Sequence, residues 1–156
     1  LDHLSVTENL ALHTAGGFGT HLLQRGVTIN DKQRADEIME FLGISALADL
    51  DMGSLSYGQK KLLDLGAVLM ADPALILLDE PAAGVNLRLL ENIIDKLVTL
   101  KEQGKTILLV EHNMDVVMGV SDDVIVMSAG QIIATGNPSE IQNNPDVLEA
   151  YLGRNT

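Results

Sequence analysis

An apolar run that ends in two acids restricts the fold of this chain more than any other feature. Leu75-Ile76-Leu77-Leu78 is entirely aliphatic, and Asp79-Glu80-Pro81 follows it directly. Such a run predicts a strand that is covered on both faces, so charged side chains fit only at its end, where water or a cation offsets the cost of desolvation. Ligands of open α/β sheets bind at the carboxyl ends of strands. We therefore expect an α/β fold with a ligand site beside the two acids.

The flanking sequence extends this strand into a parallel α/β core. Its expected elements are a helix over 58–71, the strand over 74–79, a helix over 86–103 and a second buried strand over 106–110. A strand, a helix and a strand in this order predict a right-handed βαβ unit. Further along, the sequence predicts a short helix near 113–120, paired strands over 123–127 and 131–134, and two short helices within 138–152.

The first 54 residues have a different, mostly helical pattern. Apolar residues recur at helical spacing between Asp31 and Leu42, and Gly43 supplies a stop. The glycines of residues 14–20 predict a flexible loop. The chain is therefore expected to contain a helical part (1–54), a motif with its helix (55–72), an α/β half (73–136) and a helical tail (137–156).

The composition disfavours several classes of protein. Ten Lys and Arg residues against 22 Asp and Glu residues give a formal charge of −12, which argues against nucleic acid as a partner. The absence of cysteine excludes disulfides and thiolate metal sites. No apolar run approaches the roughly 20 residues of a membrane-spanning helix, and the first residues do not resemble a signal peptide. We expect a protein that is soluble or peripheral to a membrane.

Asp79 and Glu80 are the first candidate site residues. Adjacent strand residues point to opposite faces, so the two acids are able to hold different roles. We expect Asp79 to lie near a Mg²⁺ ion and Glu80 to face an attacking water. The alternative is a strand end with two solvated acids before a turn.

A second candidate site is the segment Leu55-Ser56-Tyr57-Gly58-Gln59, which precedes a predicted helix. Ser56 and Gln59 have the spacing of a capping box, in which each side chain bonds the other residue's backbone amide. A helix N-terminus with an exposed hydroxyl, a glycine and backbone N–H groups also suits a phosphate. Both interpretations stay open, because the same residues can serve capping and anion binding.

His112 is the third candidate, because it follows the second predicted strand. A single histidine is more often a surface or structural residue, since imidazole is common in loops. If the βαβ unit is correct, however, His112 lies beside the acids at the same edge of the sheet.

These motifs, taken in order, resemble those of ABC-type ATPases. Residues 55–59 resemble the signature motif, 75–81 the Walker B motif, and Leu109-Val110-Glu111-His112 the switch histidine segment. Three further segments look like the branched-chain amino-acid uptake branch of the family: 80–86, 116–122 and the tail 136–153. Leu4 to Leu10 also resembles the segment just beyond the glutamine loop. The resemblance implies a partial P-loop-NTPase-like parallel sheet with flanking helices and a helical subdomain.

The resemblance also implies roles for individual residues. Ser56, Gly58 and Gln59 would contact the γ-phosphate of an ATP that a partner subunit mainly holds. Asp79 would support Mg²⁺, Glu80 would polarise the hydrolytic water, and His112 would contact the γ-phosphate. Asn86 stands where many relatives carry an aspartate in the D-loop, so a strict charge pairing across a dimer is in doubt, although Asn still hydrogen-bonds.

A phosphate loop of the form G-x-x-x-x-G-K-[ST] is missing from the chain. Gly104-Lys105-Thr106 is the only Gly-Lys-Thr, but Thr99 occupies the place of the first glycine and the tripeptide follows a helix instead of a strand. We interpret it as a helix stop. The chain also does not begin with Met, so we expect a fragment or a processed product that lacks the upstream phosphate loop. Part of the sheet would then expose apolar surface or an unpaired edge, and we expect self-association or marginal stability.

Three functions remain open from the sequence. The leading one is an ATP-hydrolysing subunit of a membrane importer, which works as a homo- or heterodimer with a second ATP-binding subunit, docks on membrane-embedded permease subunits, and lies in the cytoplasm on the inner face of the cell membrane. The isolated chain is expected to be inactive. The alternatives are a non-catalytic dimerisation or docking module and an ABC-type ATPase that acts outside transport.

Overall fold

The computed structural model describes residues 4–14 and 27–152. The chain divides into two compact units, Leu1–Leu109 and Val110–Thr156, and each is described by itself. Most of the predicted glycine-rich loop, from residue 15 onward, lies outside the described residues. Among the described helices, none combines the length and the apolar character that crossing a membrane requires.

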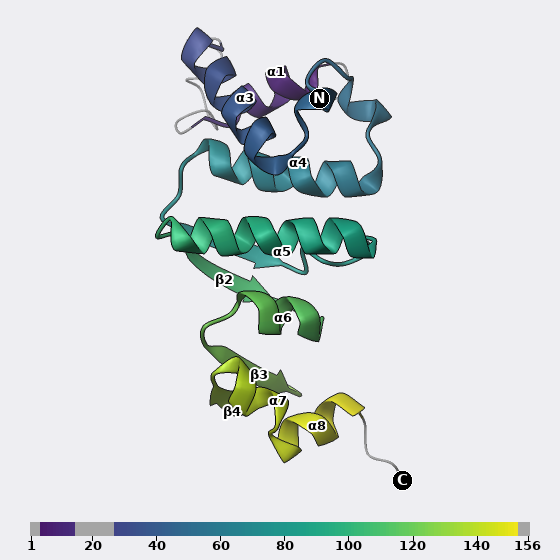
Figure 1. Cartoon of the computed structure of the whole chain (residues 1–156), viewed down its shortest axis with the longest axis vertical. Helices are drawn as coiled ribbons and strands as arrows, with labels where there is room; N and C mark the ends of the chain where they lie inside the picture. Colours follow the sequence, from purple (N-terminus) through teal and green to yellow (C-terminus); the bar gives the residue numbers. More distant parts are fainter. Residues whose placement is uncertain (1–3, 15–26, 153–156) are drawn as a thin grey trace. The chain divides into compact units, whose positions relative to one another are not determined.

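The first unit begins with a cluster of helices, as the sequence predicts. It contains α1 (Val6–Ala11), α3 (Ile29–Leu42) and α4 (Tyr57–Met70), with the 3-10 helices η1 (Ser45–Leu47) and η2 (Met52–Ser54) between α3 and α4. The three α-helices pack on one another (Figure 1). Their shared core includes Val6, Leu10 and Leu42, all at most 1% exposed. Gly66 of α4 lets Leu10, Ile38 and Leu42 approach the helix closely.

Side-chain caps explain where these helices begin. Ser5, Thr28 and Ser56 precede α1, α3 and α4, and each forms a complete capping box with the acid or amide residue three positions later. A capping box satisfies two backbone N–H groups that the helix itself leaves without partners. The three helix starts are therefore fixed by local sequence.

The α/β part of the first unit contains β1 (Leu75–Asp79), α5 (Leu87–Glu102) and β2 (Thr106–Val110), of which only the last residue belongs to the second unit. The two strands are neighbours in a parallel sheet, and the Thr106 N–H donates to the Ala74 carbonyl over 2.9 Å where they begin. Leu97 and Leu100 of α5 are buried. The predicted βαβ unit is thus confirmed, with boundaries within one or two residues of those expected.

One face of this sheet is open, which corrects the expectation that β1 is covered on both faces. Ile76 is 1% exposed, whereas Leu75 and Leu77 are 52% and 64% exposed, and Leu108 of β2 is 59% exposed. Exposure alternates with the period of two that a strand imposes when only one face is packed. The prediction was wrong because a purely aliphatic run does not reveal whether residues 1–156 include a second layer of helices or strands that packs on the other face of the sheet. The expected exposed apolar surface is confirmed.

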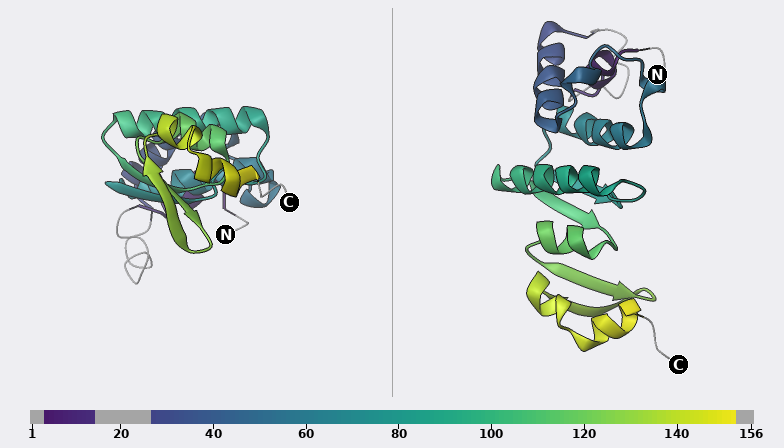
Figure 2. Two further views of the ribbon diagram at one scale, coloured as in Figure 1. Left: turned by 90° about the horizontal axis from the view of Figure 1, so that it is seen from below. Right: turned by 45° about the vertical axis from the view of Figure 1, so that its right-hand side comes forward.

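The second unit contains α6 (Met114–Val120), β3 (Val124–Ser128), β4 (Gln131–Gly136), α7 (Pro138–Gln142) and α8 (Pro145–Leu152). β3 and β4 pair antiparallel and lie side by side in both views of Figure 2. Ala129 and Gly130 of the connecting turn both have positive φ, 49° and 77°, which is the geometry of a tight hairpin turn. Val116 and Ile141 are buried. The predicted hairpin and the two prolines at helix starts are confirmed.

Candidate functional site

The start of α4 has the capping geometry that the sequence predicts. Ser56 Oγ accepts a hydrogen bond from the Gln59 amide at 3.4 Å, and Gln59 Oε1 accepts one from the Ser56 amide at 2.8 Å. Ser56 is exposed, so its hydroxyl is accessible from solvent while it caps the helix. The positive end of the helix dipole lies at the same place. Anion binding by Ser56, Gly58 and Gln59 stays a prediction that this geometry permits.

Asp79 and Glu80 lie where β1 ends, and both are exposed. Asp79 is the last residue of the strand, and Glu80 has a φ of +44°, in the left-handed region that residues other than glycine rarely occupy. Because the strand does not continue through Glu80, strand alternation does not separate the two acids as we expected. Instead, the backbone turn at Glu80 sets the direction of its side chain. Backbone strain of this kind is concentrated at functional sites.

The first turns of α4 lie against the segment that follows Glu80. Lys61 Nζ donates to the Glu80 carbonyl at 3.4 Å, and the Tyr57 hydroxyl donates to the Ala83 carbonyl at 3.4 Å. Gly84, with a φ of +72°, faces the Tyr57 ring so closely that a Cβ there would lie 3.1 Å from Tyr57 Cε1. Sequence reasoning missed Tyr57 and Lys61 as partners of this turn. Their spacing of four residues, which places them on one face of α4, was the available signal.

Asn86 begins α5 as its N-cap, and its Oδ1 accepts from the Leu89 amide at 3.0 Å. The neutral side chain therefore does the capping work that an aspartate at this position would also do. The capping role gives Asn86 a local structural function in addition to any contact with a partner subunit.

A pocket of about 200 Å³ lies between α4, β1 and α5. Its walls are mainly apolar, with three charged side chains among them. The lining residues are Lys61, Asp64, Leu65, Val68, Leu78, Asp79, Pro81, Ile93 and Leu97. The pocket places Asp79 and Lys61 in one surface feature, so the acid at the end of β1 shares its surroundings with the base from α4.

His112 lies in the second unit, two residues after the end of β2. Its backbone N–H donates to Glu111 Oε2 at 3.0 Å, and Asn113 caps α6 by accepting from the Asp115 amide at 3.0 Å. These local bonds hold the chain in a turn at the end of the strand. Whether His112 lies beside Glu80 stays a prediction, because the two residues belong to different units.

The donor set around Asp79 fits magnesium better than a metal that is coordinated by protein side chains alone. Within residues 4–14 and 27–152, no three His, Cys, Asp or Glu side chains gather closely enough to hold a metal ion by themselves. Mg²⁺ is usually bound by one or two carboxylates, together with water and substrate phosphates. An exposed carboxylate at a strand end suits that mode of binding, in which water and a substrate phosphate would supply the remaining oxygen ligands.

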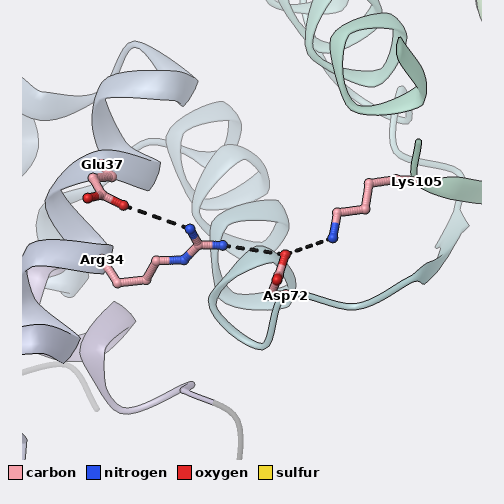
Figure 3. A network of polar contacts seen from close by, with 4 residues as sticks. All are labelled: Arg34, Glu37, Asp72 and Lys105. Atoms are coloured by element: carbon pink, nitrogen blue, oxygen red, sulfur yellow. Dashed lines mark hydrogen bonds and ion pairs between the residues drawn. The ribbon is translucent and has the colours of Figure 1, made fainter. Parts of the chain in front are cut away.

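Gly104-Lys105-Thr106 serves as the helix stop that the sequence predicts. Gly104 has a φ of +87° just beyond α5, and the Lys105 amide donates to the Leu100 carbonyl at 3.1 Å. The Lys105 ammonium lies 2.7 Å from Asp72 Oδ1, where Arg34 Nη2 also approaches to 3.6 Å, and Arg34 pairs with Glu37 (Figure 3). Lys105 is thus engaged in an ion-pair cluster near the start of β2, whereas Asp79 and Glu80 lie at the end of β1.

Comparison with known families gives two matches. The family described as "ABC transporter" matches residues 1–83. The family described as "Branched-chain amino acid ATP-binding cassette transporter" matches residues 131–155. The first match contains the Ser56 motif and both acids, and the second covers β4 and the helical tail.

Individual relatives agree with these families. The chain is 37% identical to the "Probable branched-chain amino acid transport ATP-binding protein LivG" of Archaeoglobus fulgidus, over 98% of this chain and 62% of that protein. It is 34% identical to the "High-affinity branched-chain amino acid transport ATP-binding protein BraF" of Pseudomonas aeruginosa, over 98% of this chain and 61% of that protein. The chain therefore spans less than two thirds of the length of these relatives.

The fold of this chain is closely similar to those of solved structures. The ADP conformation of MJ1267, described as an ATP-binding cassette of an ABC transporter, aligns with a TM-score of 0.81 and 35% identity over 99% of this chain and 65% of that one. A nucleotide-free ATP-binding cassette from an ABC transporter aligns with a TM-score of 0.82 and 36% identity, with the same coverage of both chains. The similarity thus extends through both units.

Proposed function

Because the chain belongs to the family of ABC transporter ATP-binding proteins, we propose that it is part of a subunit that hydrolyses Mg-ATP to energise a membrane importer of branched-chain amino acids. The observation that carries the proposal is the position of Asp79 and Glu80, exposed at the carboxyl end of β1 and next to the turn that α4 contacts. The match of residues 131–155 and the names of the relatives support the choice of solute.

The proposed chemistry is phosphoryl transfer to water, in which positioning and electrostatic stabilisation do most of the work. Glu80 orients and polarises the attacking water, and His112 donates a hydrogen bond to the γ-phosphate. Ser56, Gly58 and Gln59 supply the helix N-terminus that contacts the γ-phosphate of a nucleotide held mainly by the partner subunit. Asp79 would hold Mg²⁺, which would neutralise charge on the phosphates.

The chain by itself is proposed to be inactive. Residues 1–156 contain no G-x-x-x-x-G-K-[ST] segment, so they lack the backbone cradle that holds the phosphates in such enzymes. Calorimetry with Mg-ATP on residues 1–156 tests this directly. No binding heat is expected, and tight binding that disappears in Asp79→Ala would contradict the proposal by revealing a phosphate site within the chain.

The proposed partners are a second ATP-binding subunit and membrane-embedded permease subunits. Residues 1–72, which carry the helices of the first unit and the Ser56 motif, are the proposed docking part, and 73–136 the proposed catalytic half with 137–156 as its tail. The proposed location is the cytoplasm, peripheral on the inner face of the cell membrane.

Hydrolysis is best tested in a chimeric subunit, in which residues 1–156 replace the matching part of the Archaeoglobus fulgidus relative. Glu80→Gln should abolish ATP turnover while the chimeric subunit still binds Mg-ATP, because the amide keeps the shape of the side chain but polarises water poorly. Glu91→Gln, an exposed acid of α5, is the matched control and should turn over normally. Undiminished turnover in Glu80→Gln would refute the assigned role.

A further inference from the structure

The backbone at Glu80 needs support from outside its own turn. Its φ of +44° is in the left-handed region, where the Cβ crowds the backbone, and such a conformation persists only when the surroundings hold it. Part of that support is local, since the Ala83 amide donates to the Glu80 carbonyl at 3.1 Å and closes the turn. The direction of the Glu80 side chain depends on this one peptide.

Lys61 supplies a second donor to the same carbonyl. Its ammonium lies 3.4 Å from the Glu80 oxygen, so the carbonyl accepts from the turn on one side and from α4 on the other. A charged donor makes a stronger hydrogen bond than a neutral one. Lys61 is half-buried and lines the pocket that also contains Asp64 and Asp79, so it is the positive charge beside two acids.

Tyr57 strengthens the same connection. Lys61 Nζ lies 5.8 Å from the centre of the Tyr57 ring, within the range of a cation–π interaction. The Tyr57 hydroxyl donates to the Ala83 carbonyl, and its ring covers Gly84. Two side chains, four residues apart on α4, therefore hold both ends of the turn over residues 80–84.

We infer that Lys61 is a positioning residue for Glu80, and that together with Tyr57 it couples the phosphate-contacting start of α4 to the carboxylate that polarises water. This inference rests on the proposed function. Ser56 and Gln59 lie in the same two turns of α4 as Tyr57 and Lys61. A displacement of that helix start, when the nucleotide of the partner subunit is engaged, is transmitted through Lys61 to the Glu80 peptide. Lys61 does not itself contact the nucleotide.

The test is steady-state ATP hydrolysis by the chimeric subunit. Lys61→Met keeps the length and apolar stem of the side chain but removes the donor, and it should lower kcat about ten- to hundredfold, as small misplacements of catalytic groups do, with little change in KM. Lys61→Arg, which restores a charged donor, should recover part of the lost kcat. Lys60→Met removes the same charge from the adjacent exposed position and should leave kcat unchanged.

Each outcome separates this inference from the proposed function. If the unsubstituted chimeric subunit hydrolyses ATP and Glu80→Gln does not, but folded Lys61→Met keeps its full kcat, the positioning role is overturned while the proposed function stands. A rise in KM at constant kcat would also overturn it, because Lys61 would then act in nucleotide binding. Should Lys61→Met not fold, Tyr57→Phe tests the same link, since it removes only the hydroxyl that reaches Ala83; an unchanged kcat there would overturn the coupling.

Discussion

Lys105 Nζ donates a hydrogen bond to Asp72 Oδ1 over 2.7 Å, and this pair joins the turn after α4 to the start of β2. Arg34 of α3 approaches the same carboxylate oxygen, so a single acid connects the helical cluster with the βαβ unit (Figure 3). The Asp72 backbone has a φ of +47°, which Asp and Asn tolerate better than most residues. The hydrogen bond and the charge of Lys105, together with a smaller effect of Arg34, lower the pKa of Asp72 below its ordinary value of 3.8.

The first prediction concerns this acid and pH. Since its pKa is lower in the folded chain than in the unfolded one, Asp72 stabilises the fold above pH 3.8, and the contribution disappears as the pH falls below 3.8 through the folded pKa. Asp72→Asn keeps the backbone conformation and should lower the urea midpoint at pH 7. At a pH below the folded pKa, the midpoints of the variant and the parent should coincide.

The effect should be modest and salt-dependent, because the Asp72 side chain is 70% exposed. Asp36→Asn is the control, since it removes the same charge from α3 but no ion pair that the structure describes. Equal changes in midpoint for Asp36→Asn and Asp72→Asn at pH 7 would mean that net charge, and not the contact with Lys105, is responsible.

The second prediction separates the two roles of Ser56. Ser56→Ala removes the cap and should lower the free energy of unfolding by about 0.5–2 kcal/mol. Ser56→Asp keeps a capping oxygen, so stability should be retained, but its carboxylate would repel a phosphate and should abolish hydrolysis by the chimeric subunit. Thr28→Ala, which removes the cap of α3, should lower stability without this loss of turnover. Normal turnover in Ser56→Asp would show that the motif serves only to cap α4.

The third prediction concerns packing beneath the sheet. Leu97 of α5 is 0% exposed, so Leu97→Ala should lower the free energy of unfolding by about 2–5 kcal/mol through lost burial and the cavity that remains. Leu87→Ala, on the same helix but at a position 68% exposed, should change it by less than about 0.5 kcal/mol. Urea denaturation of both variants tests this contrast, and similar losses would place the core of this unit elsewhere.

The fourth prediction concerns the open face of the sheet. Leu75, Leu77 and Leu108 are exposed leucines of two neighbouring strands, so residues 1–156 in isolation should associate as concentration rises. Changing all three to Thr keeps strand propensity and should reduce the association measured by sedimentation. Leu87→Gln removes a comparably exposed leucine from a helix and should have little effect. A parent chain that stays monomeric at high concentration would contradict the prediction.

Local sequence was sufficient for much of the fold. The capping box of Ser56 and Gln59 was predictable because it depends on two residues three apart, and the helix stop at Gly104 because few residues adopt its backbone conformation. The order of strand, helix and strand followed from two short apolar runs with a segment of helical period between them. These features share one property: their energies are determined within a few residues of the chain.

The features that escaped prediction depend on distant segments. Whether one or both faces of β1 are covered depends on which other segments pack against the sheet. The leucines at positions 75 and 77 would be equally suitable in either case, so their residue type does not decide it. The left-handed backbone of Glu80 is not encoded by Glu80 itself. The contact of Lys61 with its carbonyl required knowing that α4 lies against this turn, 19 residues along the chain. The candidate acids were identifiable by type and spacing. The spacing of Tyr57 and Lys61 places them on one face of α4, but it does not show that this face contacts the turn after β1.

The residue type at position 58 is constrained by the neighbouring helix α5. A Cβ at this residue would overlap Leu89 Cδ2, at the start of α5, so the absence of a side chain serves packing as well as any approach of phosphate. The two positions should therefore change in a preferred order during evolution. Shortening Leu89 first creates space in which a larger residue at 58 is accommodated, whereas the reverse order passes through a crowded intermediate. A combinatorial library at positions 58 and 89 should recover large residues at 58 more often alongside small ones at 89.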